Sequence, residues 1–463
     1  MQLGFLSLLQ FFLDPLQYFS FTRIGIIPGI YLGRILSLLL IITLLVSPRH
    51  QHRFFIIKSF RIALFSLPYA PFIWITIIAA IPALLTSDSV YLLIRFAIIE
   101  PFTNIAYIAI FTILPSLASS QFQRLKASQY ILPFINLFLS IGYLDFFASC
   151  IGINLLGRSI FDRVEVGARF HSLSHEPRDY VVTSVYLLAF LAVANISSLS
   201  SLTLPAFGLN YKSFTLSLLI FSVFLAKSST FFAGLAYFLM LCAIYILVMA
   251  LKKFTAFPRL LARYATYAIL AIPFVYLFSS FIFDIRISTY LETFSSIFTF
   301  STDHFIDSLL VTPLLKPQAS TFLPMLKFFE DFSFGNILNI LFGYGHGFIS
   351  NYLSSQLFFD STDIYNSYSG LPRLLCETGI IGLASFSYMY FSIILVNKHS
   401  HRHSLALTAS GPITLYYLCS IALFCMYLAH RRQEIFLFMG IVNCYLKPSA
   451  AGDSLVSPRT PSA

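Results

Sequence analysis

The densest group of side chains that could do chemistry lies at 169–180, in the run RFHSLSHEPRDY. Arg169 and Arg178 carry planar guanidinium groups, which bind phosphate or pyrophosphate through paired hydrogen bonds and stay charged at any physiological pH. Glu176 could take a proton from a reacting hydroxyl or orient one of these arginines. The run therefore indicates an anion site beside a carboxylate. The alternative is a solvated loop whose arginines pair with neighbouring carboxylates.

The same region also contains residue types that bind metal ions. His171 and His175 are four residues apart with Glu176 beside the second, a spacing that supplies metal ligands on a helix. Pro177 argues against a regular helix through Glu176, because the residue before a proline avoids the α region. No third ligand follows at a recognisable spacing. We therefore predict an anion site that also includes Arg163, with no metal and no cofactor.

A second group of polar residues lies in the run IYNSYSGLPRLLCETGIIGL, at Ile364–Leu383. Asn366, Tyr368 and Arg373 come just before an apolar segment, and we expect Glu377 in the first turn of that segment. The alternative for the Arg and Tyr residues is ordinary anchoring at a membrane interface.

Glycines accompany this second group. The run FGYGHG, at Phe342–Gly347, predicts a tight turn or a close backbone approach, and it contains His346. Gly379 and Gly382 would let another helix approach closely.

Composition sets the class of protein that must position these residues. The chain has 463 residues, of which 58% are hydrophobic and 10% charged, whereas soluble proteins have about 25% charged residues. This excludes a soluble enzyme, a disordered scaffold and a secreted module built on disulfides. The apolar runs are long and continuous, whereas membrane β-strands alternate polar and apolar residues. We expect an all-α, polytopic integral membrane protein.

A membrane-spanning helix needs about 20 mostly apolar residues, and roughly twelve stretches qualify. They form a predicted transmembrane domain at 1–447, followed by a polar tail at 448–463 that we expect to be disordered. The predicted spans lie near 3–19, 28–47, 62–85, 90–117, 130–150, 181–197, 213–227, 229–251, 264–283, 377–396, 405–428 and 433–447.

Lys and Arg in alternate loops predict the orientation, because short cytoplasmic loops of membrane proteins are rich in these residues. Both ends of the chain then face the cytoplasm, and loops at 151–180 and 284–376 face the opposite side. The second loop is far longer than the usual connection of about 4–6 residues, and loops of that length are usually functional. Near 327–334 it mixes Phe with charged residues, which is typical of a short amphipathic helix. The net charge of +10 therefore comes mostly from the Lys and Arg residues that orient the chain in the membrane, and it does not indicate nucleic-acid binding.

Three motifs resemble those of the O-antigen polymerase and O-antigen ligase superfamily (Wzy-like and WaaL-like proteins). RFHSLSHEP resembles its Arg-x-x-x-Leu-x-x-Glu-Pro loop, and AKSSTFFAGLAYFL resembles its Ser-rich helix start. The third is the glycine turn FGYGHG followed by YNSYSGLPRLLCETGIIGL. The order of the motifs matches the family over roughly residues 150–400. Ligases usually have His where Tyr365 stands and Arg near Ser229, so both departures favour a polymerase.

The resemblance implies a metal-independent, GT-C-like glycosyltransferase of lipopolysaccharide biosynthesis. Such an enzyme acts on undecaprenyl-pyrophosphate-linked glycans at the periplasmic face of the bacterial inner membrane. A polymerase joins oligosaccharide repeat units, whereas a ligase moves the finished chain onto lipid A-core. The partners expected from this resemblance are the lipid-linked oligosaccharide, membrane lipid and a polysaccharide chain-length regulator.

The expected site combines the two polar groups. Candidate catalytic residues are Glu176, Arg169 and Glu377. Candidate residues for binding pyrophosphate or glycan are Arg163, Arg178, Arg373, His175, Asn366, His346 and Tyr368. The alternative from a different functional class is a lipid-linked oligosaccharide flippase, which is a transporter. A carrier would place its ionisable residues at mid-membrane around a cavity, whereas most of the unusual charge here lies in the predicted outer loops.

Overall fold

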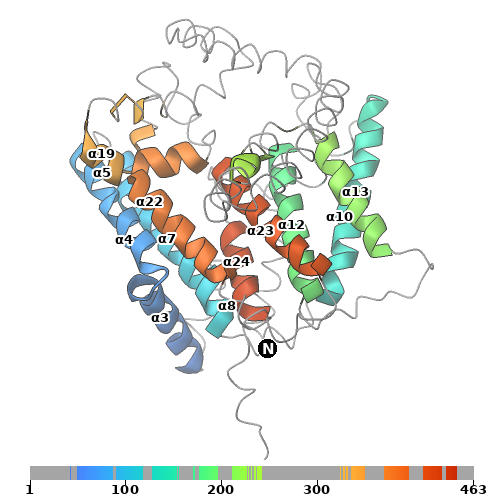
Figure 1. Cartoon of the computed structure of the whole chain (residues 1–463), viewed down its shortest axis with the longest axis horizontal. Helices are drawn as coiled ribbons and strands as arrows, with labels where there is room; N and C mark the ends of the chain where they lie inside the picture. The colour runs from blue at the N-terminus through green and yellow to red at the C-terminus, as the bar shows by residue number, and fades with distance from the viewer. Residues whose placement is uncertain are drawn as a thin grey trace, which may run out of the picture. The chain divides into compact units, whose positions relative to one another are not determined.

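Every regular element of the described part of the chain is a helix. The computed structural model describes residues 42, 50–86, 90–117, 128–153, 155, 170, 172, 177–196, 211–226, 228, 231, 234–235, 237–241, 324, 327–328, 330–331, 335–349, 370–395, 410–429 and 434–445. Its helices, labelled in Figure 1, are α3 (His50–Phe65), α4 (Ala70–Ile78), α5 (Ala80–Thr86), α6 (Val90–Leu93), η3 (Ile94–Ile99), α7 (Glu100–Ala106), η4 (Tyr107–Ile113), α8 (Leu114–Leu117), α10 (Ser128–Cys150), α12 (Pro177–Ile196), α13 (Tyr211–Leu225), α19 (Ile337–Phe342), α22 (Gly370–Leu395), α23 (Ser410–Ala429) and α24 (Glu434–Tyr445).

Three helical segments of the described part are long and apolar enough to cross a membrane: Ile94–Leu117, Pro133–Cys150 and Gly370–Leu395. A bent pair, Phe54–Phe65 with Ala70–Leu85, would make a fourth. These segments support the membrane class predicted from composition. The predicted total of about twelve spans and the long outer loop remain predictions. Of the predicted spans, those near 3–19 and 264–283 lie outside the described residues, as do the tail at 448–463 and all of 28–47 except residue 42.

The bent pair differs from the single segment expected at 62–85. Helix α3 ends at Phe65, the residues Ser66–Tyr69 form a turn, and α4 begins at Ala70, with a bend of 76° between the two apolar segments. Pro68 explains the break, because a proline has no N–H for the helical ladder and its ring clashes with the preceding turn. The segment 48–61, between the predicted spans 28–47 and 62–85, is expected to be a loop, but its residues Arg53, Lys58 and Arg61 lie within α3.

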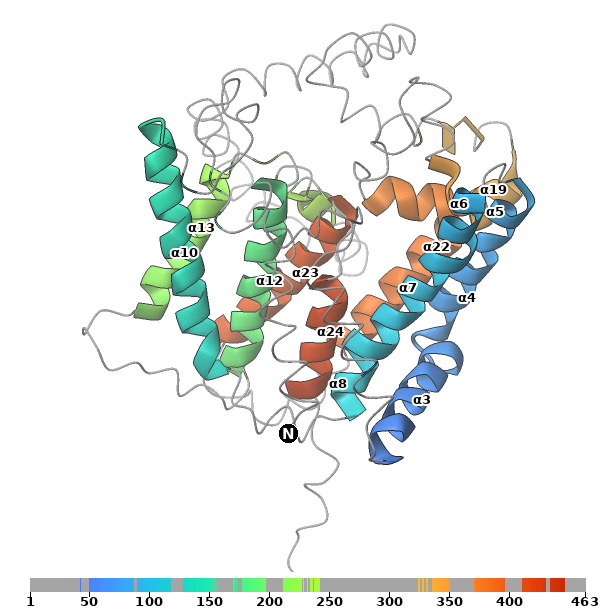
Figure 2. The same ribbon diagram turned by 180° about the vertical axis from the view of Figure 1, so that it is seen from behind.

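The chain divides into two compact units. The first comprises Met1–Ala226, Gly382–Phe424 and Arg432–Ala463, and the second comprises Lys227–Ile381 and Cys425–Arg431. In the first unit, α24 lies between α8 and α12, as the views from both sides show (Figures 1 and 2).

Packing in the first unit centres on α24. Thr112 of η4 donates its hydroxyl to the carbonyl of Phe436 at 3.1 Å, and Asn443 donates its amide to the carbonyl of Thr112 at 3.4 Å. These bonds satisfy polar groups that would otherwise be costly in an apolar interior. Gly440 is the point of closest approach, because a Cβ there would overlap the carbonyl oxygen of Phe111.

The contact at Gly440 gives a test of this packing. Gly440→Ala should destabilise the protein by about 1–3 kcal/mol, since the added methyl meets backbone and backbone cannot rotate away. The midpoint of thermal unfolding in detergent, followed by size-exclusion chromatography, measures the effect. Ala384→Val is the control, because Ala384 is exposed on α22 and should accept a larger increase in volume. Equal midpoints for the two variants would contradict the packing.

Candidate functional site

The glycine turn after α19 is the first part of the site. Gly343, Gly345 and Gly347 have φ values of 76°, 91° and 84°, a region that residues with a side chain seldom adopt. The alternation of glycine with Tyr344 and His346 thus folds the chain tightly while presenting two functional side chains. The predicted tight turn at Phe342–Gly347 is confirmed.

The turn lies directly on the backbone of α22. The N–H groups of Tyr344 and Gly345 donate to the carbonyls of Cys376 and Glu377 at 2.7 and 3.2 Å. A Cβ on Gly343 would lie 2.5 Å from the carbonyl carbon of Glu377. The predicted close backbone approach is therefore present as well.

Gly379 makes this contact possible from the side of α22. Its φ of 68° and ψ of −171° interrupt the helix, so carbonyls just before it can accept hydrogen bonds from outside the helical ladder. A Cβ on Gly379 would overlap the carbonyl of Leu341. The close approach predicted for Gly379 is confirmed, and it is made by the end of α19.

Glu377 is the centre of the site. Its carboxylate is 3% exposed and has contacts on both oxygens. The oxygen Oε2 accepts from Arg373 Nε at 3.1 Å and lies 3.0 Å from His346 Nδ1, while Oε1 accepts from the N–H of Gly347 at 3.1 Å. One carboxylate therefore joins the glycine turn, the imidazole and the guanidinium.

The charges of this cluster compensate one another. Arg373 and Glu377 are four residues apart on α22, which places their side chains together on one helix face. A buried carboxylate is costly unless a cation and hydrogen bonds accompany it, and Arg373 supplies the positive charge. Because an ionised carboxylate can only accept, His346 is the donor in this contact, through Nδ1.

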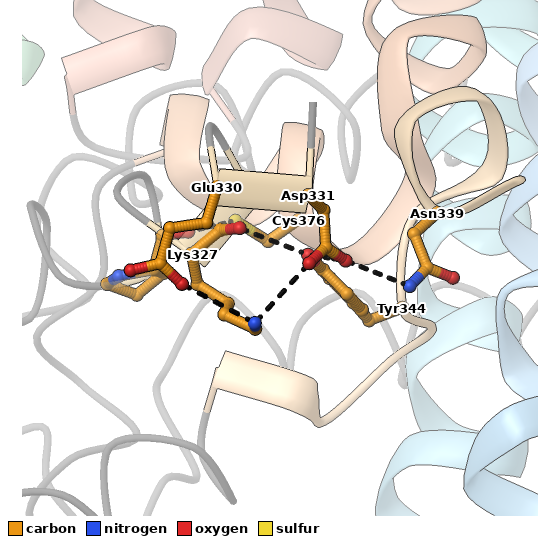
Figure 3. Close-up of polar contacts among 7 residues, drawn as sticks. Lys327, Glu330, Asp331, Asn339, Tyr344 and Cys376 are labelled. Carbon is orange, nitrogen blue, oxygen red and sulfur yellow. Dashed lines mark hydrogen bonds and ion pairs between the residues drawn. The ribbon is translucent and has the colours of Figure 1, made fainter. Parts of the chain in front are cut away.

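A second network holds the other side of the turn, shown in Figure 3. The oxygen Oδ2 of Asp331 accepts from the hydroxyl of Tyr344 at 2.7 Å and from Nδ2 of Asn339 at 3.1 Å. Lys327 Nζ lies 3.3 Å from the other oxygen of Asp331 and 3.5 Å from Glu330.

These contacts shift the acidity of both charged partners. The hydrogen bond from Tyr344, followed by that from Asn339, lowers the pKa of Asp331. The hydrogen bond to Asp331 raises the pKa of Lys327. Burial and the neighbouring carboxylate raise the pKa of Tyr344, so this phenol stays protonated and donates. The network therefore remains charged at neutral pH.

The structure brings together three of the predicted site residues: Arg373, Glu377 and His346. Arg178 lies at the beginning of α12, in the other unit, and its side chain is not described. The remaining candidates lie outside the described residues: Arg163, Arg169, His175, Glu176, Asn366 and Tyr368.

Two predicted boundaries differ from the structure. Helix α22 begins at Gly370, so Glu377 lies well inside it and not in its first turn. Pro372 does not prevent this early start, because a proline is tolerated in the first turn of a helix. Helix α12 likewise begins at Pro177, inside the loop predicted at 151–180. Here the proline that disfavours a helix through Glu176 is itself the first helical residue.

Two residues of the run RFHSLSHEP are fixed within the first unit. The N–H of Phe170 donates to the carbonyl of Leu225 at 3.0 Å, and its ring packs on Tyr143 and Tyr180 at centroid distances of 4.8 and 4.9 Å. Ser172 donates its hydroxyl to the carbonyl of Phe138. The motif is therefore attached to α10, α12 and α13 by a buried aromatic residue and a serine.

The role of Asp331 was not predicted from the sequence. Lys327, Phe328, Glu330 and Asp331 are helical, with Phe328 buried and Glu330 exposed, as the amphipathic pattern predicts. Lys327 and Asp331 are four residues apart, so a helical pattern predicts that they pair. The same pattern does not predict the bond between Asp331 and Tyr344. In the described part, no three His, Cys, Asp or Glu side chains come together in a way that could hold a metal ion.

No protein-family model matches the chain, and no curated protein matches it. The likeness to the polymerase and ligase superfamily therefore depends on the three motifs alone.

The central position of Glu377 can be tested by removing its charge. Glu377→Gln should destabilise the protein by about 1–3 kcal/mol, because the amide presents a donor to Arg373 or His346 and leaves buried groups unsatisfied. The thermal midpoint of the purified protein at pH 7 measures this. Glu330→Gln is the matched control, since Glu330 is 59% exposed and contacts only the flexible end of Lys327 among the described side chains. A midpoint as high as that of this control would contradict the account of Glu377.

Proposed function

We propose that the chain is a surface-polysaccharide polymerase of the O-antigen type. It joins undecaprenyl-pyrophosphate-linked oligosaccharide repeat units at the periplasmic face of the inner membrane, as a metal-independent glycosyltransferase. The observation that carries the proposal is the cluster of Arg373, Glu377 and His346, which joins the two parts of the third motif of the family resemblance.

The reaction defines what such a site must supply. A hydroxyl oxygen of the acceptor sugar bonds to the anomeric carbon of the donor glycan, and the bond from that carbon to the pyrophosphate oxygen breaks. The bonding electron pair leaves with the lipid pyrophosphate, and the hydroxyl proton goes to a base. The site therefore needs a proton acceptor beside a cation that stabilises the developing phosphate charge.

His346 is the proposed proton acceptor. Its Nδ1 is held at 3.0 Å from Glu377, and we propose that Nε2 is the ring nitrogen that takes the acceptor proton. Histidine is the side chain that most often acts as a general base in enzymes. The imidazolium that forms is then stabilised by the carboxylate that orients the ring.

Glu377 is the proposed positioning residue for the cluster. Its two oxygens have contacts with Arg373, His346 and the N–H of Gly347. Hydrogen bonds and a cation favour the ionised form of a carboxylate, which suits orientation better than proton uptake. Glu176, the first candidate for the base from the sequence, remains the alternative to His346.

Arg373 is the proposed ligand of the leaving pyrophosphate. A guanidinium has five N–H donors in a planar fork, and the contact with Glu377 uses Nε. The side chain is 18% exposed, so the group reaches the surface of the cluster. Arg169 and Arg178, in the outer-face arginine cluster, remain the further pyrophosphate ligands that the sequence predicts.

The proposal predicts the glycan made by variants in a strain that lacks this gene. His346→Ala and Arg373→Ala should leave a surface glycan of single capped repeat units. Loss of a catalytic group of this kind typically lowers the rate by about 10²–10³. Arg373→Lys keeps the charge but not the planar fork, so it should give only short polymer. Gel electrophoresis of the surface polysaccharide measures chain length.

Glu330→Gln, made in parallel, should give polymer of normal length, and an immunoblot should show equal amounts of every variant in the membrane. Normal polymer in both alanine variants would rule out this site as the catalytic centre. The deletion strain itself distinguishes the alternatives: polymer left on the lipid carrier would mean a ligase, and lipid-linked repeats kept on the cytoplasmic side would mean a flippase.

A further inference from the structure

Tyr344, two residues before His346 in the glycine turn, is held from three directions. Its N–H donates to the carbonyl of Cys376 at 2.7 Å. Its hydroxyl donates to Asp331 at 2.7 Å, and its ring stacks on Phe348 with centroids 4.0 Å apart. The side chain thus connects the turn that carries His346 to a carboxylate that the proposed reaction does not use.

Asp331 is itself firmly placed. Its side chain is 12% exposed and lies 3.3 Å from Lys327 Nζ, and Asn339 of α19 donates to the same oxygen as Tyr344 (Figure 3). Its backbone carbonyl accepts from the N–H of Asn336, immediately before α19, at 3.1 Å. Asp331 therefore bonds to Asn336, immediately before α19, and to Tyr344, in the glycine turn after α19.

The turn needs such an anchor because of its composition. Glycine loses more conformational freedom on folding than any other residue, and three glycines alternate with Tyr344 and His346 here. On one side, Glu377 holds His346 and Gly347. On the other side, Tyr344 donates its hydroxyl to the charged carboxylate of Asp331.

We propose that Asp331 is a positioning residue: its carboxylate, acting through the Tyr344 hydroxyl, holds the glycine turn so that His346 meets Glu377. The effect on catalysis rests on the proposed function, whereas the effect on His346 itself does not. Without the carboxylate, the turn samples other conformations and the imidazole spends part of its time away from Glu377 and open to water.

The exposure of His346 can be measured directly, because its side chain is only 2% exposed in the intact site. Diethyl pyrocarbonate transfers its ethoxycarbonyl group to an accessible imidazole nitrogen, which adds a fixed mass to the peptide. The test uses the purified full chain in detergent and compares wild type, Asp331→Asn, Tyr344→Phe, the double variant and Glu330→Gln. Peptide mass spectrometry gives the modification rate at each of the 10 histidines.

Tyr344→Phe should raise the rate at His346 by about tenfold or more, the factor that corresponds to losing a hydrogen bond to a charged group, and Asp331→Asn should raise it by a smaller factor. The double variant should react no faster than the faster single variant, because both changes act on the same bond: Asp331→Asn weakens it by removing the acceptor's charge, and Tyr344→Phe removes its donor. Glu330→Gln should react as wild type, and the other histidines should keep their rates in every variant. Tyr344→Phe keeps the ring on Phe348, so it tests the bond even where Asp331→Asn folds poorly.

Three results would overturn the inference. The first is a wild-type rate at His346 in Tyr344→Phe, and the second is full additivity in the double variant. The third is an equal rise at all histidines, which would show that Asp331 supports the fold as a whole. If the wild-type protein makes no polymer, the proposed function fails, yet the rates at His346 still decide the role of Asp331. If polymer forms, Asp331→Asn should lower kcat more than it raises KM.

Discussion

In the described part of the second unit, the packing of the glycine turn on α22 depends on one interaction, the burial of the Glu377 carboxylate between this helix and the turn. A charge in that position is stable only when a cation and several donors surround it. Arg373 comes from the same helix face, whereas His346 and the N–H of Gly347 come from a turn 30 residues earlier in the chain. Satisfying one carboxylate therefore requires the turn and the helix to assemble together.

Backbone contact makes this assembly possible, and glycine makes the backbone contact possible. Gly343 and Gly379 lie where a Cβ would overlap the facing main chain, and the break at Gly379 leaves carbonyls available for the N–H groups of the turn. The same glycines give the turn freedom in the unfolded chain. This explains why side-chain anchors flank it on both sides, at Glu377 and at Asp331.

The sequence predicts the elements better than it predicts their contacts. Long apolar runs identify candidate membrane-spanning segments such as Ile94–Leu117, because the thickness of the bilayer sets the length of a helix that crosses it. Glycine spacing predicts the turn, because positive φ angles exclude most other residues. The bend after Phe65 was missed because an apolar run hides the effect of Pro68. The bonds of Asp331 with Tyr344 and of Glu377 with His346 were missed because no periodicity relates residues so far apart in the chain.

The proposed chemistry follows from that carboxylate, since it orients a proton acceptor and holds a guanidinium beside it. The most direct test is glycosyl transfer by the purified protein in liposomes supplied with an undecaprenyl-pyrophosphate-linked oligosaccharide. The account predicts that wild-type protein forms polymer and releases one undecaprenyl pyrophosphate for each new linkage, and that His346→Ala forms neither product while remaining folded. Equal rates for the two proteins, or transfer without release of the pyrophosphate, would contradict it.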